Sequence, residues 1–375
     1  MQHRKVPSLG LCLVCLSLAA PTRGGESKKD QPPLPPAVAA AREKGLDWLT
    51  KHQSADGSWG SKGHSIAVTS FACLAYLSAA DEPFTGERGK ALVKGLRFLL
   101  SQQKDGVFAQ QGHTWIHGQG FGTLALAEAY GRSLFCKTQP DIDLKQVRKA
   151  VAAAVAAIAK HQSTSGGLWY TPGMPGQHEG STTVCAVQAI VAAGNYGIPT
   201  DTKALDKGFE YLKKCQTKEG GFNYKQGDGT NMKEGTAGDV ATLGLMQKFD
   251  FPVMIKGYQF LVKITPAAIS AERFPYYGHF YGCMAMHLLG QEYRDDKTFR
   301  EKTRAYIAGV QKDLLAWQDK EGAWPKKGWF TTTGSEDAGF PTAFATLALG
   351  LPEGRLSIYN RTPPKLPGAG AGGKE

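Results

Sequence analysis

Gln53-Ser-Ala-Asp-Gly57-Ser-Trp59 is the first of five closely similar stretches in this chain of 375 residues. Each copy follows a predicted helix and joins a glutamine, a glycine and an aromatic residue across a short turn. The other copies read Gln103-Lys-Asp-Gly106-Val-Phe108, Gln162-Ser-Thr-Ser-Gly166-Gly-Leu-Trp169, Gln216-Thr-Lys-Glu-Gly220-Gly-Phe222 and Gln318-Asp-Lys-Glu-Gly-Ala-Trp324. Successive glutamines are 50, 59, 54 and 102 residues apart, and the last interval is twice 51. A period of about 50 residues indicates one supersecondary unit that is repeated.

Each unit pairs a partly polar helix with a more apolar one. The helix before the turn carries a Lys-Gly pair in several units, and the helix after the turn is apolar on almost every side. These apolar segments are residues 65–79, 122–130, 182–193, 240–248, 282–289 and 341–349. A helix that is apolar all round has to be buried. The sequence therefore predicts an all-α fold, an α/α toroid of about six helical hairpins with inner and outer rings, over residues 38–352.

The five stretches are predicted to be structural. The glutamine amide can bond backbone groups at the end of the outer helix, and the aromatic ring can pack over the turn. A motif that recurs in unit after unit is more typical of a fold than of a catalytic site. The fifth unit lacks the motif, and Phe274-Pro-Tyr-Tyr277 stands in its place. The predicted structural residues are Gln53, Trp59, Gln103, Phe108, Gln162, Trp169, Gln216, Phe222, Gln318 and Trp324.

The pattern of Lys-Gly, aliphatic run, Gln, Gly and Trp resembles the glutamine–tryptophan motif of the terpene cyclase and protein prenyltransferase superfamily. Two catalytic signatures of that superfamily are absent. Squalene–hopene-type cyclases use an Asp-x-Asp-Asp cluster at the start of an inner helix, and this chain lacks one. Asp141-Ile-Asp143 lies before an outer helix, and Glu336-Asp337 is only a pair. Protein prenyltransferases bind zinc through Asp-x-Cys and a later His, and here Asp239 and His279 fall close to those places while Ala241 replaces the Cys. The resemblance implies the fold, and no metal or cofactor is predicted.

The two ends of the chain are predicted to lie outside the folded domain. Residues 1–19 combine Arg4 and Lys5 with an apolar stretch and a small-residue site at Ala19, which indicates a cleaved signal peptide. Residues 20–37 are a Pro-rich linker, and residues 353–375 are predicted to be a disordered tail. We expect a secreted or periplasmic protein without a transmembrane segment.

Composition argues against several further classes. Five cysteines follow the signal peptide, an odd number without metal or redox spacing, so a disulfide scaffold is not expected. Cys73, Cys185 and Cys283 lie in predicted inner helices and are expected to be buried. The formal charge of +11 falls to +9 without Arg4 and Lys5, and its lysines are spread over the outer helices. A solvated surface explains this charge better than an acidic partner does, and no nucleic-acid motif is present.

Candidate site residues precede or begin the inner helices. Aligned on those helices, His64, His117, His178, Tyr277 and Glu336 take equivalent places, with His113, Glu179, Asp239, His279 and Asp337 nearby. In a closed toroid, equivalent positions meet at one end of the ring. The group is interpreted either as an acid–base pocket or as helix caps and loop contacts. If it is catalytic, one His should lie about 2.6–3.2 Å from a carboxylate, or reach it through one water, and that carboxylate should raise the pKa of the His.

The same loops carry aromatic residues that suit either a prenyl chain or stacked sugars. They are Trp115, Trp169, Tyr170, Tyr276, Tyr277, Trp329 and Phe330. The first interpretation is an exported toroid that binds an apolar or extended ligand, or a partner, in its central cavity. The alternatives are a lyase or hydrolase acting on polysaccharide, and an isoprenoid cyclase or transferase with unusual acid residues. The expected ligand classes are accordingly isoprenoid, lipid or glycan.

Overall fold

The computed structural model describes residues 33–60, 63–111, 114–174, 176–328 and 338–367. Within these ranges the chain forms thirteen α-helices and a single two-stranded hairpin, β1 (Gln103–Lys104) and β2 (Val107–Phe108). Two short 3-10 helices, η3 (Leu351–Glu353) and η4 (Ser357–Tyr359), follow the last α-helix. No helix in the described ranges is long and apolar enough to cross a membrane.

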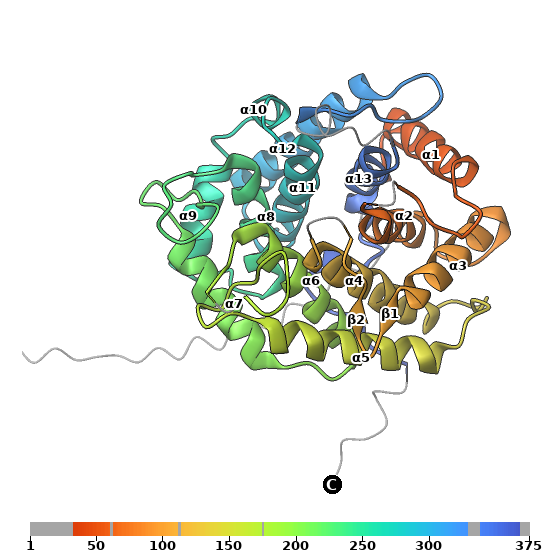
Figure 1. Cartoon of the computed structure of the whole chain (residues 1–375). Coiled ribbons are helices and arrows are strands. Elements are labelled where there is room, and N and C mark those ends of the chain that lie inside the picture. Colours follow the sequence, from red (N-terminus) through yellow and green to blue (C-terminus); the bar gives the residue numbers. More distant parts are fainter. Residues whose placement is uncertain (1–32, 61–62, 112–113, 175, 329–337, 368–375) are drawn as a thin grey trace, which may run out of the picture.

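Twelve of the helices form two concentric rings (Figure 1). The inner ring consists of α2 (Ser65–Ala79), α4 (Ile116–Ser133), α6 (Gly180–Asn195), α8 (Lys233–Leu245), α11 (Pro275–Glu292) and α13 (Gly339–Gly350). The outer ring consists of α1 (Pro36–Lys51), α3 (Gly86–Ser101), α5 (Leu144–His161), α7 (Thr202–Cys215), α9 (Pro252–Leu261) and α12 (Lys297–Trp317). A short helix, α10 (Pro266–Ser270), joins α9 to α11. The predicted α/α toroid is confirmed.

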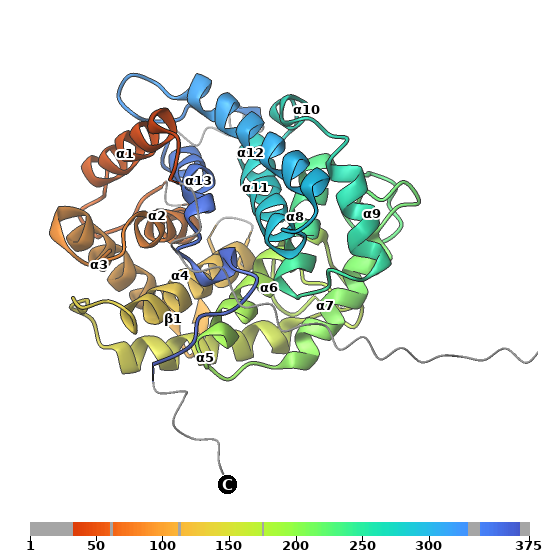
Figure 2. The same ribbon diagram turned by 180° about the vertical axis from the view of Figure 1, so that it is seen from behind.

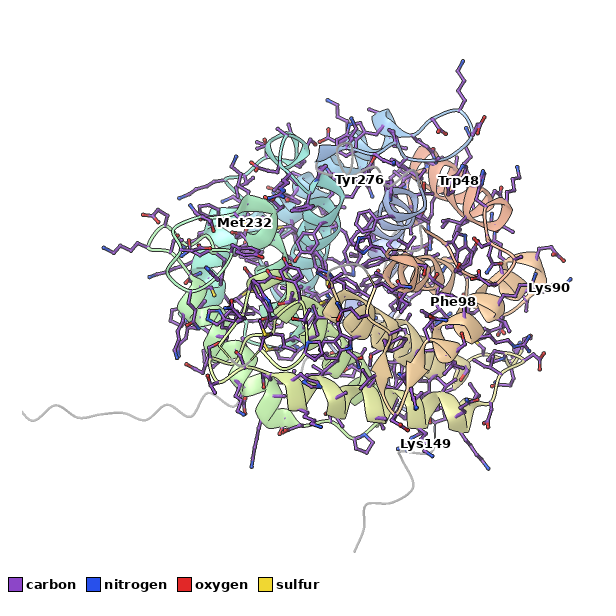
Figure 3. The ribbon with its side chains drawn as sticks, viewed as in Figure 1. Trp48, Lys90, Phe98, Lys149, Met232 and Tyr276 are labelled. Carbon is purple, nitrogen blue, oxygen red and sulfur yellow. The ribbon has the colours of Figure 1, made fainter. Side chains whose placement is uncertain are left out.

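Burial explains the two layers. Almost every residue of the inner helices is buried, whereas the outer helices bury one face and expose the other. Lys90 and Lys149 extend into solvent from α3 and α5 (Figure 3). Cys73, Cys185 and Cys283 are buried with free thiols, as expected.

The ring is closed between its first and last units. Each inner helix contacts the next, and α13 contacts both α1 and α2. Gln318 at the end of α12 donates from Nε2 to the carbonyl oxygen of Ala41 in α1, at 2.7 Å. Trp324 packs directly over Gly45 of the same helix. Contacts between residues almost 280 positions apart therefore replace the capping repeats that an open solenoid requires.

The glutamine turns join each unit to the next. Gln53 Nε2 donates to the carbonyl of Gly57 within its own turn, at 2.9 Å, and to Ala91 in the next outer helix, at 2.8 Å. Gln162, Gln216 and Gln318 make the same pair of bonds, and their outer-helix acceptors are Ala204, Val253 and Ala41. The indole nitrogens of Trp59 and Trp324 donate to Leu49 and Leu314, each at 2.7 Å. The indole donors satisfy carbonyls in the last turn of α1 and of α12, whereas the glutamine amides join each turn to the N-terminal half of the next outer helix.

The second unit departs from the prediction for Gln103. Among the described residues its Nε2 has no hydrogen-bond partner. Gln119 of α4 takes its place, donating to Gly106 O at 2.8 Å and Ala154 O at 3.1 Å while accepting from Phe108 N. Gln103 stands three residues before the turn glycine, not four, and belongs to the β1–β2 hairpin. The side chain of Gln103 therefore cannot reach the carbonyl groups of Gly106 and Ala154.

The third unit corrects the prediction for Trp169. The residue that packs into the turn is Leu168, which is 2 % exposed and whose N–H donates to Thr183 Oγ1 at 3.1 Å. Leu168 stands two residues after the turn glycine, as the aromatic residues do in the other copies. Trp169 is only partly buried and packs edge-on against Tyr170. Its contribution to stability is therefore expected to be small.

The turn glycines are required by their backbone conformation and by close approach. Their φ angles lie between +85° and +99°, a region that L side chains seldom adopt. A Cβ atom at any of them would lie 2.2–2.6 Å from a carbonyl oxygen of the next outer helix. These residues are Gly57, Gly106, Gly166, Gly220 and Gly322.

The C-terminal segment, residues 351–361, packs across the end of the barrel where the inner helices finish (Figure 2). The buried carboxylate of Glu128 in α4 holds it, accepting from the N–H of Ser357 and Ile358, from Ser357 Oγ and from Tyr196 OH. Leu356, Ile358 and Tyr359 are at most 1 % exposed. The predicted disordered tail from residue 353 is therefore wrong for residues 353–361, because these apolar side chains are buried.

Candidate functional site

The N-terminal ends of the inner helices gather at one end of the barrel, which we call the mouth. All six inner helices run in the same direction because an outer helix returns the chain between them. Loops at this end bond to their neighbours: Trp115 N donates to Tyr170 O at 2.6 Å, and Gly180 N to Tyr224 O at 2.8 Å. The mouth is thus built from consecutive units.

The predicted histidines lie near the mouth, where His117 and His178 contact different partners. His64 immediately precedes α2. His117 Nδ1 lies 2.9 Å from Thr114 Oγ1, and its ring packs against Tyr170. His178 Nδ1 lies 3.2 Å from the hydroxyl of Tyr211 in outer helix α7, and burial lowers the pKa of His178. Glu336 and Asp337 lie outside the described residues.

His279 faces the outer layer. Its Nε2 lies 3.0 Å from Ser270 Oγ, which donates to Asp313 Oδ2 at 2.7 Å. The direct distance from His279 Nε2 to Asp313 Oδ2 is 3.9 Å, longer than the pairing expected of a catalytic histidine. Burial lowers the pKa of His279 to about 4, although Asp313 acts in the opposite direction. The expectation of a raised histidine pKa is therefore wrong for His279. The hydrogen bonds that link His279, Ser270 and Asp313 join the inner helix α11 to the outer layer.

One hydrogen bond recurs in the five units with a glutamine turn, and it shows which residues of their inner helices are equivalent. In each glutamine turn, the N–H of the residue two places after the glycine donates to one inner-helix side chain. Those acceptors are Thr69, Gln119, Thr183, Thr236 and Thr342. In this register His64 and His178 are equivalent, five residues before the acceptor, whereas His117 is only two residues before it. The alignment that grouped His117 with them is therefore wrong.

Asp239 is the exceptional residue in this register. It stands three residues after the acceptor Thr236, where the other four units have Ala72, Gly122, Ala186 and Ala345. Asp239 is 2 % exposed, and its Oδ1 has no hydrogen-bond partner among the described residues. A Cβ atom on Gly180 would lie 3.6 Å from this oxygen, so the carboxyl group lies against the first turn of α6.

Glu179 is a second buried carboxyl group at the same place. It caps α6, accepting from the N–H of Ser181 at 2.8 Å and of Thr182 at 2.7 Å. Burial raises the pKa of Glu179 to about 7 despite these bonds. Burial, and after it the charge of Glu179, raises the pKa of Asp239 well above its ordinary value. We call Glu179 and Asp239 the acid pair.

Three tyrosines, Tyr170, Tyr224 and Tyr277, surround the acid pair and are called the tyrosine wall. Tyr170 and Tyr224 come from successive units, and their hydroxyl oxygens are 2.8 Å apart. Burial raises the pKa of all three phenols, with the charge of Glu179 acting in the same direction. The hydroxyl of Tyr277 is buried without a partner among the described residues and lies directly against Gly238, beside Asp239.

A metal site is not formed by the residues that the resemblance suggested. Asp239 lies against α6, whereas His279 contacts Ser270 and Trp317 on the outer side of α11. In the ranges that the structure covers, no three His, Cys, Asp or Glu side chains come together in an arrangement that could hold an ion. Zinc would require such a convergence of ligands.

Below the mouth, aromatic side chains fill the axis of the barrel. The ring of Phe71 in α2 lies 4.0 Å from that of Phe344 in α13 and 4.3 Å from that of Phe121 in α4, between centroids. Gln188 in α6 donates to Tyr281 OH in α11 at 2.5 Å, although α8 separates these helices in the ring. At this depth, side chains of the described residues meet across the axis of the barrel.

Replacing Asp239 with alanine is expected to raise the free energy of unfolding by about 1–3 kcal/mol at pH 8, because a buried carboxyl without a partner is removed. The raised pKa means that the folded parent holds an extra proton relative to the unfolded chain. The parent should therefore lose stability as pH rises above about 4, the ordinary carboxyl pKa. Chemical denaturation at pH 4, 6 and 8 should show the advantage of the variant growing with pH. A variant less stable than the parent at pH 8 would contradict this account.

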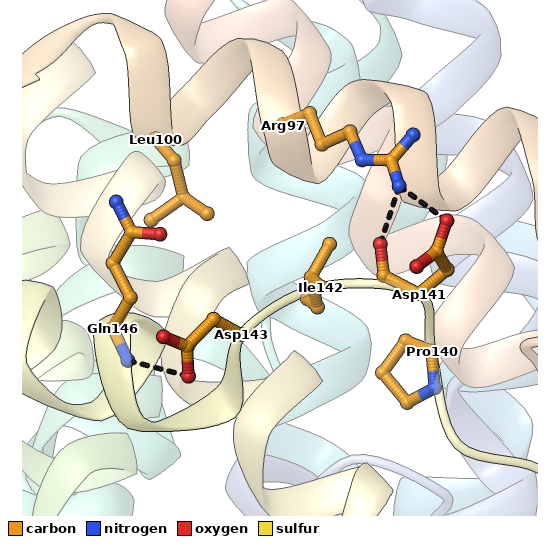
Figure 4. Close-up of a pocket in the computed structure, with 7 residues that line it drawn as sticks. All are labelled: Arg97, Leu100, Pro140, Asp141, Ile142, Asp143 and Gln146. Atoms are coloured by element: carbon orange, nitrogen blue, oxygen red, sulfur yellow. Dashed lines mark hydrogen bonds and ion pairs between the residues drawn. The ribbon is translucent and has the colours of Figure 1, made fainter.

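A separate groove of about 380 Å³ lies on the outer surface between α3 and α5 (Figure 4). Arg97 donates to the backbone oxygen and the carboxylate of Asp141, each at 2.6 Å, and Asp143 caps α5. The charged groups of this groove therefore satisfy one another. None of the predicted site residues borders it, and we assign it no function.

The sequence matches a family model over most of its length. The model of the prenyltransferase alpha-alpha toroid domain matches residues 34–229, 197–251 and 255–363. A search of curated proteins found no match.

Solved structures with the same fold include proteins with different ligands. A type II terpene cyclase, MstE from Scytonema, in complex with geranylgeranyl dihydroxybenzoate is 15 % identical, with a TM-score of 0.56 over 85 % of this chain and 98 % of the cyclase. A substrate-free variant of the same enzyme is 16 % identical, with a TM-score of 0.57 over 85 % and 97 % of the two chains. An α-1,6-mannanase of Salegentibacter in complex with α-1,6-mannotriose is 10 % identical, with a TM-score of 0.58 over 84 % and 98 %. At such identities the likeness concerns the fold.

Proposed function

The chain belongs to the prenyltransferase α/α-toroid family, and from this premise we propose that it binds an apolar or extended small molecule at the mouth of the barrel. The observation that carries this proposal is a group of partly exposed aromatic rings at the mouth, above an axis that is filled. These residues are Trp169, Tyr170, Tyr224, Tyr277 and Phe340. Aromatic faces bury large areas of apolar chain or sugar ring at small entropic cost, and they are common in ligand sites.

Binding can be measured by thermal shift with farnesol as the isoprenoid probe and α-1,6-mannotriose as the glycan probe. A ligand at 100 times its dissociation constant stabilises the folded protein by about 2.7 kcal/mol. Farnesol is expected to raise the melting temperature of the parent. The substitution Tyr224→Ala should weaken this effect at least tenfold in dissociation constant.

The matched control is Phe135→Ala, because Phe135 is an exposed aromatic residue just after the C-terminal end of α4, away from the mouth. This variant should bind farnesol as the parent does. If neither probe shifts the melting temperature, or if both variants bind as the parent does, the mouth is not the binding site. A shift with mannotriose alone would support a glycan ligand.

A second candidate function is proton donation to the bound molecule, and the acid pair is the observation that favours it. Asp239 is buried, and burial raises its pKa well above the ordinary value, which favours the neutral acid form. Such a group can protonate an alkene or a glycosidic oxygen. Incubation with farnesol or mannotriose followed by mass spectrometry and chromatography tests this function. Any product should disappear in Asp239→Asn while binding persists; a product that persists in this variant would exclude Asp239 as the donor.

Export is part of the proposal. The predicted signal peptide, residues 1–19, lies outside the described residues, and α1 begins at Pro36 within the predicted linker. N-terminal sequencing of the protein recovered from its native cells should begin close to residue 20. A protein that retains residues 1–19 would contradict cleavage.

A further inference from the structure

Among the described residues, no positively charged side chain pairs with the acid pair. The charged group that acts on Asp239 is Glu179, which is itself acidic. Glu179 accepts hydrogen bonds from neutral donors only: the N–H and hydroxyl of Ser181 and the N–H of Thr182. Among the described residues, Asp239 Oδ1 accepts none. Buried carboxyl groups are ordinarily paired or hydrogen-bonded, so this arrangement leaves a buried carboxyl oxygen without a donor.

The groups around the acid pair are suited to a cation. The rings of the tyrosine wall present π-electron faces, which attract ammonium groups. Tyr277 adds a buried hydroxyl oxygen that is free to accept a hydrogen bond, as Asp239 Oδ1 is. Tyr170 and Tyr224 are only partly buried, so they border both the acid pair and the mouth.

The repeat indicates that this arrangement is specific to one unit. Four other units place alanine or glycine where α8 has Asp239, so the helix packing itself does not require a carboxyl group there. Asp239 Oδ1 and Tyr277 OH are both buried without a hydrogen-bond partner among the described residues. Tyr277 OH lies against Gly238, the residue of α8 that precedes Asp239. Both point to a ligand group that supplies hydrogen-bond donors at this place.

We propose that the acid pair and the tyrosine wall form a receptor for the ammonium group of a ligand whose apolar chain lies over the aromatic residues of the mouth. This inference rests on the proposed function, because it specifies the head group of the molecule bound there. The ammonium N–H groups donate to Asp239 Oδ1 and Tyr277 OH, and the charge faces the tyrosine rings. Asp239 releases its proton to solvent as the ammonium binds and becomes the carboxylate of the new ion pair.

The test compares farnesylamine with farnesol, two molecules that share a chain and differ in the head group. Farnesylamine is expected to bind the parent at least tenfold more tightly, and Asp239→Asn should remove this difference. Isothermal titration at pH 7 in two buffers of different ionisation enthalpy should show proton release with farnesylamine in the parent and none in Asp239→Asn. Farnesol should release no proton from either protein.

Glu234→Gln is the matched control, because Glu234 is a buried acid of the same helix that lies near Lys233 and Arg273. It should keep the preference for farnesylamine. Asp239→Asn should melt no lower than the parent, which separates loss of binding from loss of folding. Potassium chloride in place of the amine serves as the probe for an inorganic cation, and equal protection by it would overturn the proposal.

The outcomes separate this inference from the proposed function. Equal affinity for farnesol and farnesylamine, with both affinities reduced by Tyr224→Ala, would overturn the ammonium receptor and leave the mouth as a binding site. Failure of both probes would overturn both proposals. A preference for farnesylamine that persists in Asp239→Asn would locate the head group elsewhere and overturn the receptor.

Discussion

Replacing Trp324 with alanine is expected to lower the free energy of unfolding by about 3–5 kcal/mol, as measured by chemical denaturation. Its ring is fully buried and packs against Gly45 of α1, and its indole nitrogen donates to Leu314 O at 2.7 Å. The substitution removes a large apolar contact between the last unit and the first, together with a hydrogen bond at the end of α12. No smaller side chain in this turn can refill the space.

The control is Trp169→Ala, which removes the same side chain from a partly exposed position. Its expected cost is below about 1 kcal/mol, because a surface substitution disturbs little packing. Equal losses in the two variants would show that burial in the glutamine turn is not what makes Trp324 important. If Trp324→Ala unfolds at the same denaturant concentration as the parent, the ring is closed by other contacts.

Replacing Gly220 with alanine is expected to cost at least about 3 kcal/mol. Its φ of +99° is unfavourable for any L side chain, and the new Cβ would lie 2.5 Å from the carbonyl oxygen of Lys256 in α9. The backbone strain alone is of order 1–3 kcal/mol, and relieving the clash requires the turn to move away from the next outer helix. Chemical denaturation of the purified variant measures the loss.

Gly227→Ala separates the two causes. Gly227 also has a positive φ, of +74°, but a Cβ atom there would meet nothing within 4 Å. Its expected cost is about 1–2 kcal/mol, the cost of the left-handed conformation. A Gly220→Ala variant no less stable than Gly227→Ala would mean that the close approach to Lys256 contributes nothing.

The repeat made the fold predictable, because each unit independently shows the sequence pattern of an outer helix followed by an inner helix. The apolar helices predicted by their composition are the inner helices, and the period of about 50 residues corresponds to one hairpin of helices. The individual contacts were less predictable. Gln103 resembles the other glutamines in sequence, but its spacing to Gly106 is one residue too short, and Gln119 from the inner helix compensates. Leu168, and not Trp169, stands two residues after the turn glycine, which is the place of the packed aromatic residue in the other copies.

The candidate site was predicted only in part. The sequence favours histidines as the site residues. In the structure, His178 and His279 contact the outer layer, and His117 does not take the repeat position of His64 and His178. Asp239 was named for its resemblance to a zinc ligand, whereas its significance comes from a repeat position that is otherwise alanine or glycine. Glu179 has no such signal, because its burial depends on loops from two neighbouring units. The packing of residues 353–361 depends in the same way on Glu128, over 220 residues distant in the chain.

Closure of the ring has a consequence for how the protein is made. The acceptor of Gln318 is Ala41, so the first outer helix leaves the ribosome long before its partner is synthesised. The faces of α1 and α2 that bind α13 stay uncovered for the whole of translation, as apolar surface open to wrong partners. Co-translational folding can therefore build an open arc of units, and the native circle forms only after the last unit is released. Such a topology requires that the open arc be protected from wrong partners until the last unit is released.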